Sequence, residues 1–568
     1  MSTKEPAKRE QWTGQYGFIL AAIGSAIGLG NIWRFPGVAY TNGGGAFLVP
    51  YLVALLTAGI PILLLDYAMG HRFRGSAPAV FRRISKKFEV VGWFQVMICL
   101  VITAYYAVIL AWALRYVFFS VNTAWGKDTM GFFVGDFLQV SEPGFNSQVV
   151  PGIFWPLVAV WVATAVVIAL GVSRGLEAAS KVFMPILVVI FMVLVVRALF
   201  LPGAAEGLNS FFTPNWAALR DPAVWIAAYS QIFFSLSVAF GIMLTYSSYL
   251  KKKTDITSTA FVAGFANSSF EILAGIGVFA TLGYMATQRG VGVNEIEGIT
   301  GPILSFVTFP EIISMMPGGA VFGVIFFTSL TLAGFTSLIS LIQVVAAAVQ
   351  EKFNINRRVA SLITCGIAGA ASVLVFSTSN GLNALDVVDK FINEIGIVSA
   401  AILMTVLVTY AVRMLPMLRH HLNYYSSIRI GKWWDLFVGF VSPLVLAVIL
   451  LFTLRSLLVE GYGDYPEGFI YKFGWGMIVM AVFVSFILSF VKWQTPVDDY
   501  DAIAYHDAGA TPPAERTRNH AQKTAAARRA RAKAIAASQQ AELAAKKAQV
   551  AEEELSALQP KYEKPEEA

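Results

Sequence analysis

The chain has 568 residues, of which 57% are hydrophobic and 14% are charged, and its formal net charge is +7. A mean hydropathy of +0.64 excludes an ordinary soluble protein and indicates an integral membrane protein. The first apolar segment follows a polar N-terminus without a small-residue cleavage pattern, so we expect no cleaved signal peptide. The positive charge is spread over loops, and we expect the lipid bilayer, and no nucleic acid, as a partner.

About twelve apolar segments are each long enough to cross roughly 30 Å of hydrocarbon at 1.5 Å per residue. They predict an all-α membrane protein whose transmembrane part covers residues 14–493, after an N-terminus at 1–13. The expected spans are 15–37, 43–70, 91–121, 153–171, 178–201, 223–250, 258–285, 318–350, 358–378, 383–412, 434–458 and 471–492.

A glycine-rich stretch interrupts the first span. Gly24, Gly28 and Gly30 fall within seven residues, and glycine lowers the cost of leaving the helical conformation. Unwound backbone is tolerated in a bilayer only where it lines a cavity or is buried in protein. We therefore expect an unwound segment at mid-membrane, and with it a site for an ion and a solute.

The sixth span is interrupted as well, by Gln231, Ser235, Ser237 and Gly241. This break lies five spans after the first, so the two halves that carry the breaks must run in opposite directions through the membrane. Interrupted helices at matching positions of inverted halves are typical of transporter sites. The predicted repeats cover 14–201 and 223–412, and two extra helices lie in 434–492.

The residues after the last span, 494–568, differ in composition. Thr511-Pro512-Pro513 marks a linker, and an alanine-rich stretch follows, basic at its start and acidic at its end. This pattern predicts a solvated helix, or one that contacts anionic lipid or a partner through its basic half.

Positive charge is segregated to alternate loops, as at Arg82, Arg83 and Lys251–Lys253, whereas the opposite loops are acidic or neutral. The positive-inside rule then places both termini in the cytoplasm. The two cysteines lie in apolar segments, and no glycosylation sequon lies in a loop, which together favour a bacterial inner membrane.

From Arg9 to about Trp493 the chain resembles the neurotransmitter:sodium symporter family, and in particular its bacterial leucine-transporting members. The resemblance implies a five-plus-five inverted repeat, unwound first and sixth helices, and sodium-driven uptake. The motifs that carry it are Gly24 to Pro36, Asn42 to Phe47, Trp225 to Tyr249, Asn267 with Glu271, Ala333 to Ser337, and Asp386 with Asp389.

For sodium, the resemblance implies two sites made of neutral oxygen atoms, which suit a hard cation. The first is implied at the Ala26 carbonyl, Asn31, Ser235 and Asn267. The second is implied at the carbonyls of Gly24, Ile27 and Ala333, with Thr336 and Ser337. Helix packing by small hydroxyl residues is the alternative interpretation of Thr336 and Ser337.

The resemblance also implies a substrate site. In monoamine transporters an aspartate at the position of Gly28 holds the amine of the substrate. Glycine has no carboxylate to offer, so the substrate must carry its own, which favours an amino acid. Amides at the start of the second half-helix can hold that carboxylate, with the Tyr106 hydroxyl as a third donor. The implied contacts are Ser25, Ala26, Leu29, Gly30, Ile102, Tyr106, Phe234, Ser235, Ser237, Phe240, Ser337 and Leu341.

Two gates are implied at the ends of the pathway. The extracellular gate consists of Arg34 with Asp389, Gln231 near Arg34, and the rings of Tyr106 and Phe234. The intracellular gate pairs Arg9 with Glu351, near Trp12 and Tyr249. Surface ion pairs contribute only about 0–1 kcal/mol, which suits contacts that must break in every cycle. Ordinary juxtamembrane charge is the alternative for Arg9 and Glu351.

Glu271 lies one helical turn after Asn267, on the same face. Chloride-dependent relatives have serine there, and their chloride-binding neighbours match Tyr51, Gln231, Ser235 and Asn267. A fixed carboxylate at this position therefore predicts chloride-independent transport. Burial favours the protonated carboxyl and nearby sodium favours the carboxylate, which leaves proton antiport through Glu271 open.

Together these features predict chloride-independent symport of a neutral, hydrophobic or aromatic amino acid with two sodium ions, into the cell and by alternating access. The alternatives are a sodium-coupled carrier of an osmolyte or γ-amino acid, and a sodium-dependent amino acid sensor that does not accumulate its ligand. The sequence contains no phosphate-binding loop and no ligand-spaced histidine cluster, so we expect neither a pump nor an enzyme. A homodimer is left open.

Overall fold

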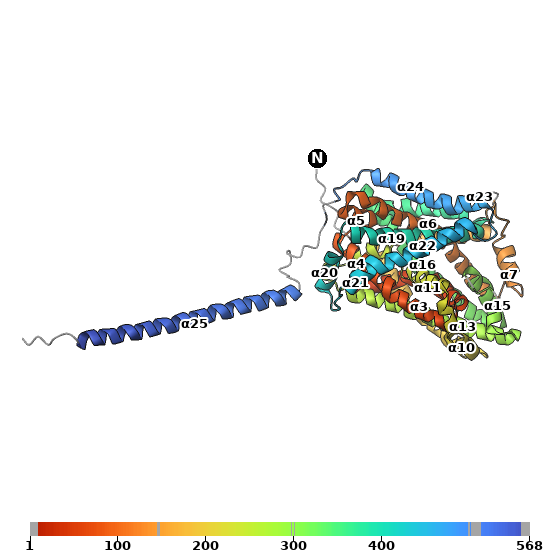
Figure 1. Ribbon diagram of the computed structural model, residues 1–568. Helices are drawn as coiled ribbons and strands as arrows, with labels where there is room; N and C mark the ends of the chain where they lie inside the picture. The colour runs from red at the N-terminus through yellow and green to blue at the C-terminus, as the bar shows by residue number, and fades with distance from the viewer. Residues whose placement is uncertain are drawn as a thin grey trace, which may run out of the picture. The chain divides into compact units, whose positions relative to one another are not determined.

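The computed structural model describes residues 10–144, 148–296, 298–299, 301–497, 500 and 513–557, with side chains of only 534–556 in the last segment. The chain divides into two units, Met1–Ala502 and Ile503–Ala568. The described part of the first unit consists of helices and loops, and its strand-like pairing is limited to two isolated bridges (Figure 1).

Ten helical segments of the first unit are long and apolar enough to cross a membrane. They are Gly45–Phe73, Lys86–Val121, Pro151–Ala169, Val172–Leu199, Ile256–Arg289, Gly319–Phe353, Arg357–Phe376, Gly381–Ala411, Trp433–Val459 and Glu467–Phe490. Most of these bounds lie within a few residues of the predicted spans.

The first and sixth spans are broken helices. Helices α1 (Gln15–Ala26) and α2 (Leu29–Thr41) meet at an angle of 49° across Ile27 and Gly28. Helices α11 (Pro222–Ser235) and α12 (Ile242–Ser248) are separated by six non-helical residues. With these two, the predicted fold class of about twelve helices with unwound first and sixth helices is confirmed.

The buried centre and the outer surface differ as expected for a bilayer protein. Helices α6 (Glu89–Val121) and α16 (Gly319–Phe353) pack along each other and are buried over most of their length. By contrast, α8 (Pro151–Ala169) and α24 (Gly476–Phe490) present large apolar side chains outward. An apolar outer surface on fully hydrogen-bonded helices is what lipid requires.

The described part of the second unit is one helix, α25 (Pro513–Ala557). Within 534–556, where its side chains are described, the large apolar ones are few and exposed, as at Leu543 and Val550. The solvated helix predicted for 494–568 stays a prediction, for which exposed side chains along 534–556 are a requirement. A contact with lipid or a partner through its basic half stays a prediction.

Glycine allows one very close helix contact. A Cβ atom added at Gly207 in α10 (Ala204–Phe212) would lie 1.8 Å from the Phe279 carbonyl oxygen of α13 (Ile256–Arg289). In the same way, a Cβ atom added at Gly283 of α13 would lie 2.2 Å from the Gly203 carbonyl oxygen. Both obstacles are backbone atoms, so neither can rotate away.

We expect Gly207→Ala to lower the thermal unfolding midpoint of the detergent-purified protein, because overpacking against backbone costs roughly 1–3 kcal/mol. Gly366→Ala is the matched control, since Gly366 lies within α17 (Arg357–Phe376) and nothing stands within 4 Å of its added Cβ. The control should keep or slightly raise the midpoint. Equal midpoints for both variants would contradict this packing.

Candidate functional site

The break in the first span redirects backbone amides. The amide of Gly28 donates to Asn31 Oδ1 at 2.9 Å, and the amide of Leu29 donates to the Tyr106 hydroxyl at 3.0 Å. In a continuous helix these two amides would bond to the carbonyls of Gly24 and Ser25. Those carbonyls are therefore released from helical bonding and point at other groups.

One hydroxyl group meets the released carbonyls. Ser337 Oγ of α16 lies 3.3 Å from the carbonyl oxygens of both Gly24 and Ser25, and 3.5 Å from that of Ile27. Thr336 is adjacent, since a Cβ added at Gly24 would lie 3.5 Å from its Cβ, and its hydroxyl donates to the Ala333 carbonyl at 3.0 Å. The structure thus brings the second predicted sodium set together.

The first predicted sodium set is a cluster of three buried side chains. Asn31 Nδ2 donates to Asn267 Oδ1 at 2.8 Å, and Asn267 Nδ2 donates to Ser235 Oγ at 2.5 Å. Ala26 is the last residue of α1. No group of three His, Cys, Asp or Glu side chains in the described residues could hold a metal ion. The candidate cation ligands are therefore neutral oxygen atoms, which suit an alkali ion.

The break in the sixth span has left-handed backbone at Ser237, Ala239 and Gly241, with φ of 53°, 66° and 91°. Such a conformation costs about 1–3 kcal/mol at a non-glycine residue, so the surroundings must support it. Two side chains do so: the amide of Ala239 donates to Asp66 Oδ2 at 2.9 Å, and Cys99 Sγ donates to the Phe240 carbonyl at 3.0 Å. Sequence reasoning did not identify either side chain, because neither belongs to a recognisable pattern.

The two breaks touch each other. Ser237 Oγ donates to the Ser25 carbonyl at 3.2 Å, and the same carbonyl lies beside Ser337 Oγ. Unwound backbone from both halves of the chain thus meets at one point, which is also next to α16. This is the junction that the two interruptions in the sequence predicted.

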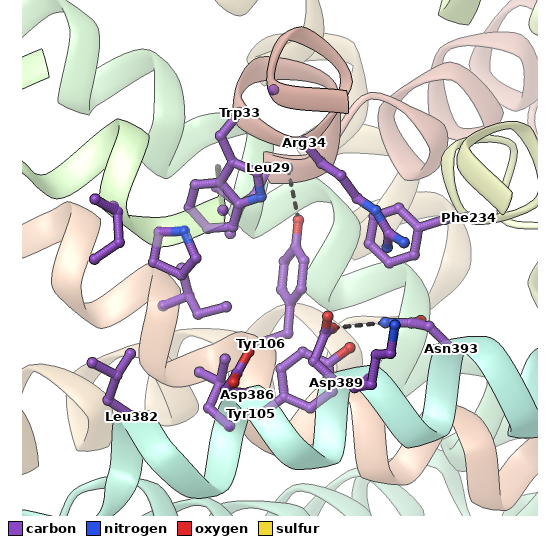
Figure 2. A pocket seen from close by; sticks show the side chains of 18 of the residues that line it. Leu29, Trp33, Arg34, Tyr105, Tyr106, Phe234, Leu382, Asp386, Asp389 and Asn393 are labelled. Carbon is purple, nitrogen blue, oxygen red and sulfur yellow. Dashed lines mark hydrogen bonds between the residues drawn. The ribbon is translucent and has the colours of Figure 1, made fainter. Parts of the chain in front are cut away.

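A cavity of about 500 Å³ reaches the first break at Leu29 and Gly30. Its inner lining includes Leu29, Gly30, Tyr106 and Phe234 of the predicted substrate set (Figure 2). The predicted side-chain pocket residues Ile102, Phe240 and Leu341 are buried and do not line the cavity. The structure therefore brings the carboxylate end of the predicted site, and not its apolar end, to the cavity.

Arg34 and Asp389 face the same cavity (Figure 2). The Arg34 guanidinium lies over the Phe234 ring, 4.6 Å from its centroid, and Asp389 accepts a hydrogen bond from Asn393 Nδ2 at 2.7 Å. Among the described ion pairs none joins Arg34 to Asp389. The cavity is open between them, and their pairing stays a prediction for a closed state.

Glu271 is buried and hydrogen-bonded. It accepts from the Tyr51 hydroxyl and from Gln231 Nε2, the latter at 2.6 Å. Both donors belong to the set that the resemblance implies as the counterpart of a chloride site. Gln231, which was predicted near Arg34, thus makes its described side-chain hydrogen bond to Glu271 instead.

At the end of the bundle that holds the N-terminus, two of the four predicted gate residues meet. The Trp12 indole donates to the Tyr246 carbonyl at 2.9 Å, and the Trp12 amide donates to the Tyr249 carbonyl at 3.2 Å. Arg9 lies outside the described residues. Glu351 accepts hydrogen bonds from the amide and hydroxyl of Ser76, at 2.8 and 2.7 Å.

Arg357 connects the elements at this end, although the sequence indicated only a positive loop residue. Its Nη1 donates to Glu10 Oε2 at 2.7 Å, and its Nη2 donates to Gln343 Oε1 at 2.5 Å. Gln343 Nε2 in turn donates to the Tyr249 hydroxyl at 2.9 Å. Because Tyr249 also accepts from Trp12, two residues after Glu10, these contacts form a closed loop, which we call the Arg357 ring.

Comparisons with known proteins agree with this architecture. The sodium:neurotransmitter symporter family matches residues 9–129 and 126–495. The chain is 40% identical over 489 residues to an uncharacterized sodium-dependent transporter of Methanocaldococcus jannaschii. The aligned region covers 85% of this chain and 98% of that protein. It is 30% identical over 425 residues to sodium- and chloride-dependent GABA transporter 2 of Bos taurus, and this aligned region covers 68% of this chain and 70% of the relative.

A solved structure is similar as well: MhsT in complex with L-phenylalanine matches with a TM-score of 0.67 and 31% identity, over 78% of this chain and 99% of MhsT. The matched residues include both broken helices and every element that contributes to the junction. The chain therefore belongs to the sodium:neurotransmitter symporter family and is a multi-pass membrane transporter rather than an enzyme.

Proposed function

We propose that the chain carries a neutral, hydrophobic or aromatic amino acid into the cell together with two sodium ions, by alternating access and without chloride. The observation that carries this proposal is the meeting of the two breaks at the Ser25 carbonyl, where Ser237 and Ser337 both direct their hydroxyls. Ligands from both halves of the chain at one point let ion and solute binding depend on the arrangement of both halves.

Two sets of neutral oxygen atoms support two sodium ions. In the first set, Asn31, Ser235 and Asn267 are already in contact, and a substrate carboxylate would supply the negative charge that this set lacks. In the second set, the carbonyls of Gly24 and Ile27 surround the Ser337 hydroxyl, and a sodium ion there would accept their lone pairs.

The space at Gly28 supports an amino acid as substrate. A Cβ atom there would lie 2.7 Å from Ser337 Oγ and 2.8 Å from the Tyr106 hydroxyl, so a side chain at this position would have to displace these hydroxyls, and glycine leaves them in place. The substrate must then bring its own carboxylate, which the amides at the start of α2 can bind. The complex of MhsT with L-phenylalanine supports an aromatic side chain. The GABA transporter relative favours a γ-amino acid as the second candidate.

Uptake by the full-length protein in vesicles tests the proposal. A tenfold sodium gradient supplies about 1.4 kcal/mol per ion and a potential of about 100 mV adds about 2.3 kcal/mol. Two ions thus permit accumulation on the order of 10⁵-fold, and one ion only about 500-fold. We expect sodium-driven accumulation of labelled phenylalanine, competed by neutral amino acids. Saturable binding without accumulation would instead identify a sensor, and competition by γ-aminobutyrate or betaine alone would identify the other carrier.

Thr336→Val tests the second sodium set. The change removes a hydroxyl at constant shape, and a lost hydrogen-bond partner of this kind is worth about 1.4 kcal/mol, so the sodium concentration for half-maximal uptake should rise about tenfold. Thr331→Val is the matched control, because Thr331 lies on the same helix but outside the predicted sodium set, and its hydroxyl likewise donates to a helix carbonyl, that of Phe327. The proposal loses this site if both variants show the same sodium dependence.

Glu271→Ser tests the role of the fixed carboxylate. Without the charge, Tyr51 and Gln231 are left with unused donors that a chloride ion can accept from, so uptake should require chloride where the unmodified protein does not. Glu271→Gln, which is neutral but fills the same space, should be inactive in either medium. Uptake by Glu271→Ser that is equal in chloride and gluconate would refute the substitution of chloride by Glu271.

Arg357→Gln tests the Arg357 ring as part of the cytoplasmic closure. Hydrogen bonds to charged groups contribute about 1.5–3 kcal/mol each, and this change weakens those to Glu10 and Gln343. We expect faster sodium-free efflux from preloaded vesicles and a lower steady-state accumulation. Arg358→Gln, an exposed neighbour, should behave as the unmodified protein. Identical efflux from the two variants would exclude the ring from gating.

A further inference from the structure

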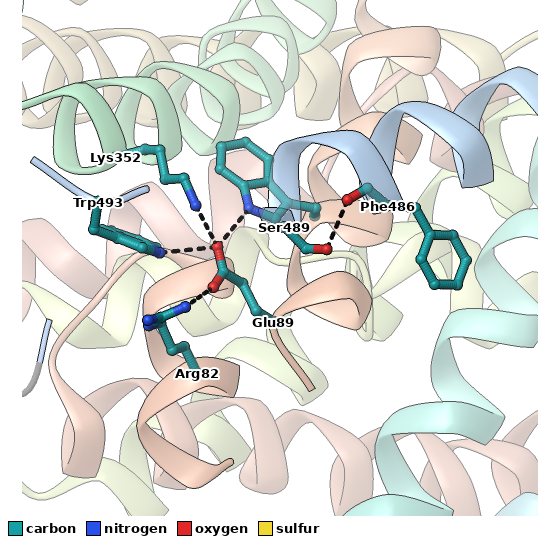
Figure 3. Close-up of polar contacts among 7 residues, drawn as sticks. Arg82, Glu89, Lys352, Phe486, Ser489 and Trp493 are labelled. Atoms are coloured by element: carbon teal, nitrogen blue, oxygen red, sulfur yellow. Dashed lines mark hydrogen bonds and ion pairs between the residues drawn. The ribbon is translucent and has the colours of Figure 1, made fainter. Parts of the chain in front are cut away.

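Four donors converge on one buried carboxylate at the start of α6. Glu89 Oε1 accepts from Lys352 Nζ at 2.6 Å, from Trp93 Nε1 at 3.1 Å and from Trp493 Nε1 at 2.9 Å. Glu89 Oε2 accepts from Arg82 Nη1 at 2.5 Å. We call these five residues the Glu89 cluster (Figure 3).

The central ion pair of the Glu89 cluster is held away from water, whereas the Arg82 side chain is partly exposed. The side chains of Glu89 and Lys352 are 1% and 0% exposed. The Lys352 ammonium also lies 4.8 Å from the Trp493 ring centroid and 5.8 Å from that of Trp93, within the range of cation–π attraction. Removing one partner from a buried ion pair leaves an uncompensated charge, which is strongly unfavourable. We therefore expect the buried ion pair to form or separate as a whole with its partners, unlike a flexible pair at the surface.

Trp493 begins a segment that continues the contact beyond the last span. The amide of Gln494 donates to the Lys352 carbonyl at 3.2 Å, and the Val497 carbonyl accepts from Arg83 Nε at 2.7 Å. The Arg83 guanidinium lies 4.3 Å from the ring centroid of Tyr500. We call residues 493–497 with Tyr500 the C-terminal strap. The family model matches up to residue 495, so the strap begins within the matched residues and continues past them.

The C-terminal strap joins two elements next to the predicted intracellular gate. Arg82 and Arg83 lie on α5 (Ala77–Ile84), and Lys352 follows Glu351 near the end of α16. Glu351 itself accepts two hydrogen bonds from Ser76, which immediately precedes α5. The strap and the Ser76 contacts thus hold the same two elements together.

We propose that Trp493 is a positioning residue for the cytoplasmic gate: the C-terminal strap fixes α5 against the end of α16, and its release permits opening toward the cytoplasm. The proposal rests on the alternating access proposed above. Trp493 contributes a hydrogen bond to Glu89 and a ring to Lys352, so both charges of the buried pair depend on it. Release of the strap exposes this pair to water, which lowers its cost of separation.

Cysteine accessibility in the full-length protein tests the strap. Ser340 of α16 is buried and accepts from the Tyr246 hydroxyl of α12 at 2.6 Å, so Ser340→Cys reports separation of these helices. A thiol reagent is applied to the cytoplasmic side of inside-out vesicles in sodium or potassium. The protein without Ser340→Cys gives the background from Cys99 and Cys365, which are both buried.

Trp493→Phe keeps an aromatic ring but removes the donor to Glu89, and we expect it to raise the labelling rate in sodium at least fivefold. Trp155→Phe, at an exposed position on α8, is the matched control and should stay within twofold of the reference. Tyr500→Ala removes the ring under Arg83 and leaves the Glu89 cluster intact; it should raise the rate by a smaller factor. This second variant provides the test if Trp493→Phe does not accumulate in the membrane.

Equal labelling rates for Trp493→Phe, Tyr500→Ala and Trp155→Phe, in a reference that responds to sodium, would overturn the strap and leave the proposed function intact. Labelling of the reference that does not differ between sodium and potassium would overturn alternating access and the strap with it. A raised rate in both strap variants supports the positioning role, because a merely local loss of packing at the last span would not expose Ser340→Cys.

Discussion

A peptide group in a bilayer must have a hydrogen-bond partner, and the site exists because two helices are broken under that constraint. Most of the groups that the breaks release are satisfied by side chains, three of them from other helices. Tyr106 and Asn31 accept from amides of the first break, and Asp66 and Cys99 hold an amide and a carbonyl of the sixth. The carbonyl oxygens of Gly24, Ser25 and Ile27 remain around Ser337, and no described backbone amide donates to them. A cation is a suitable partner for such a set of oxygens.

The two ends of the transport pathway are in opposite states. On one side a cavity of about 500 Å³ reaches Leu29 and Tyr106, and Arg34 and Asp389 face it with no described ion pair between them. On the other side the Arg357 ring and the Glu89 cluster hold the N-terminal segment, α5 and the end of α16 together. Alternating access requires a state that is closed at one end and open to a cavity at the other. The Arg357 ring and the Glu89 cluster consist of polar contacts, which can re-form after opening.

The sequence was sufficient for the features that depend on composition along the chain. Hydropathy located the spans, and glycines and serines within apolar segments located both breaks. The structure also brought together the three side chains of the first predicted sodium set, and Ser337 with the Gly24 and Ile27 carbonyls of the second. The sequence did not indicate Asp66, Cys99 or Arg357, because their partners come from other helices and their own neighbourhoods are unremarkable. It paired Arg34 with Asp389 and Arg9 with Glu351 by analogy, and both pairings stay predictions. The structure adds partners that the sequence did not indicate, Asn393 for Asp389 and Ser76 for Glu351.

The central claim is that ion and solute share one junction, and mutual binding measures this most directly. In purified full-length protein, the affinity for phenylalanine is measured at several sodium concentrations, and the affinity for sodium at several phenylalanine concentrations. Linkage requires the two couplings to be equal. We predict that saturating sodium raises the affinity for phenylalanine at least tenfold, that saturating phenylalanine raises the affinity for sodium by the same factor, and that potassium does neither. Equal affinity for phenylalanine in sodium and potassium would contradict a shared junction.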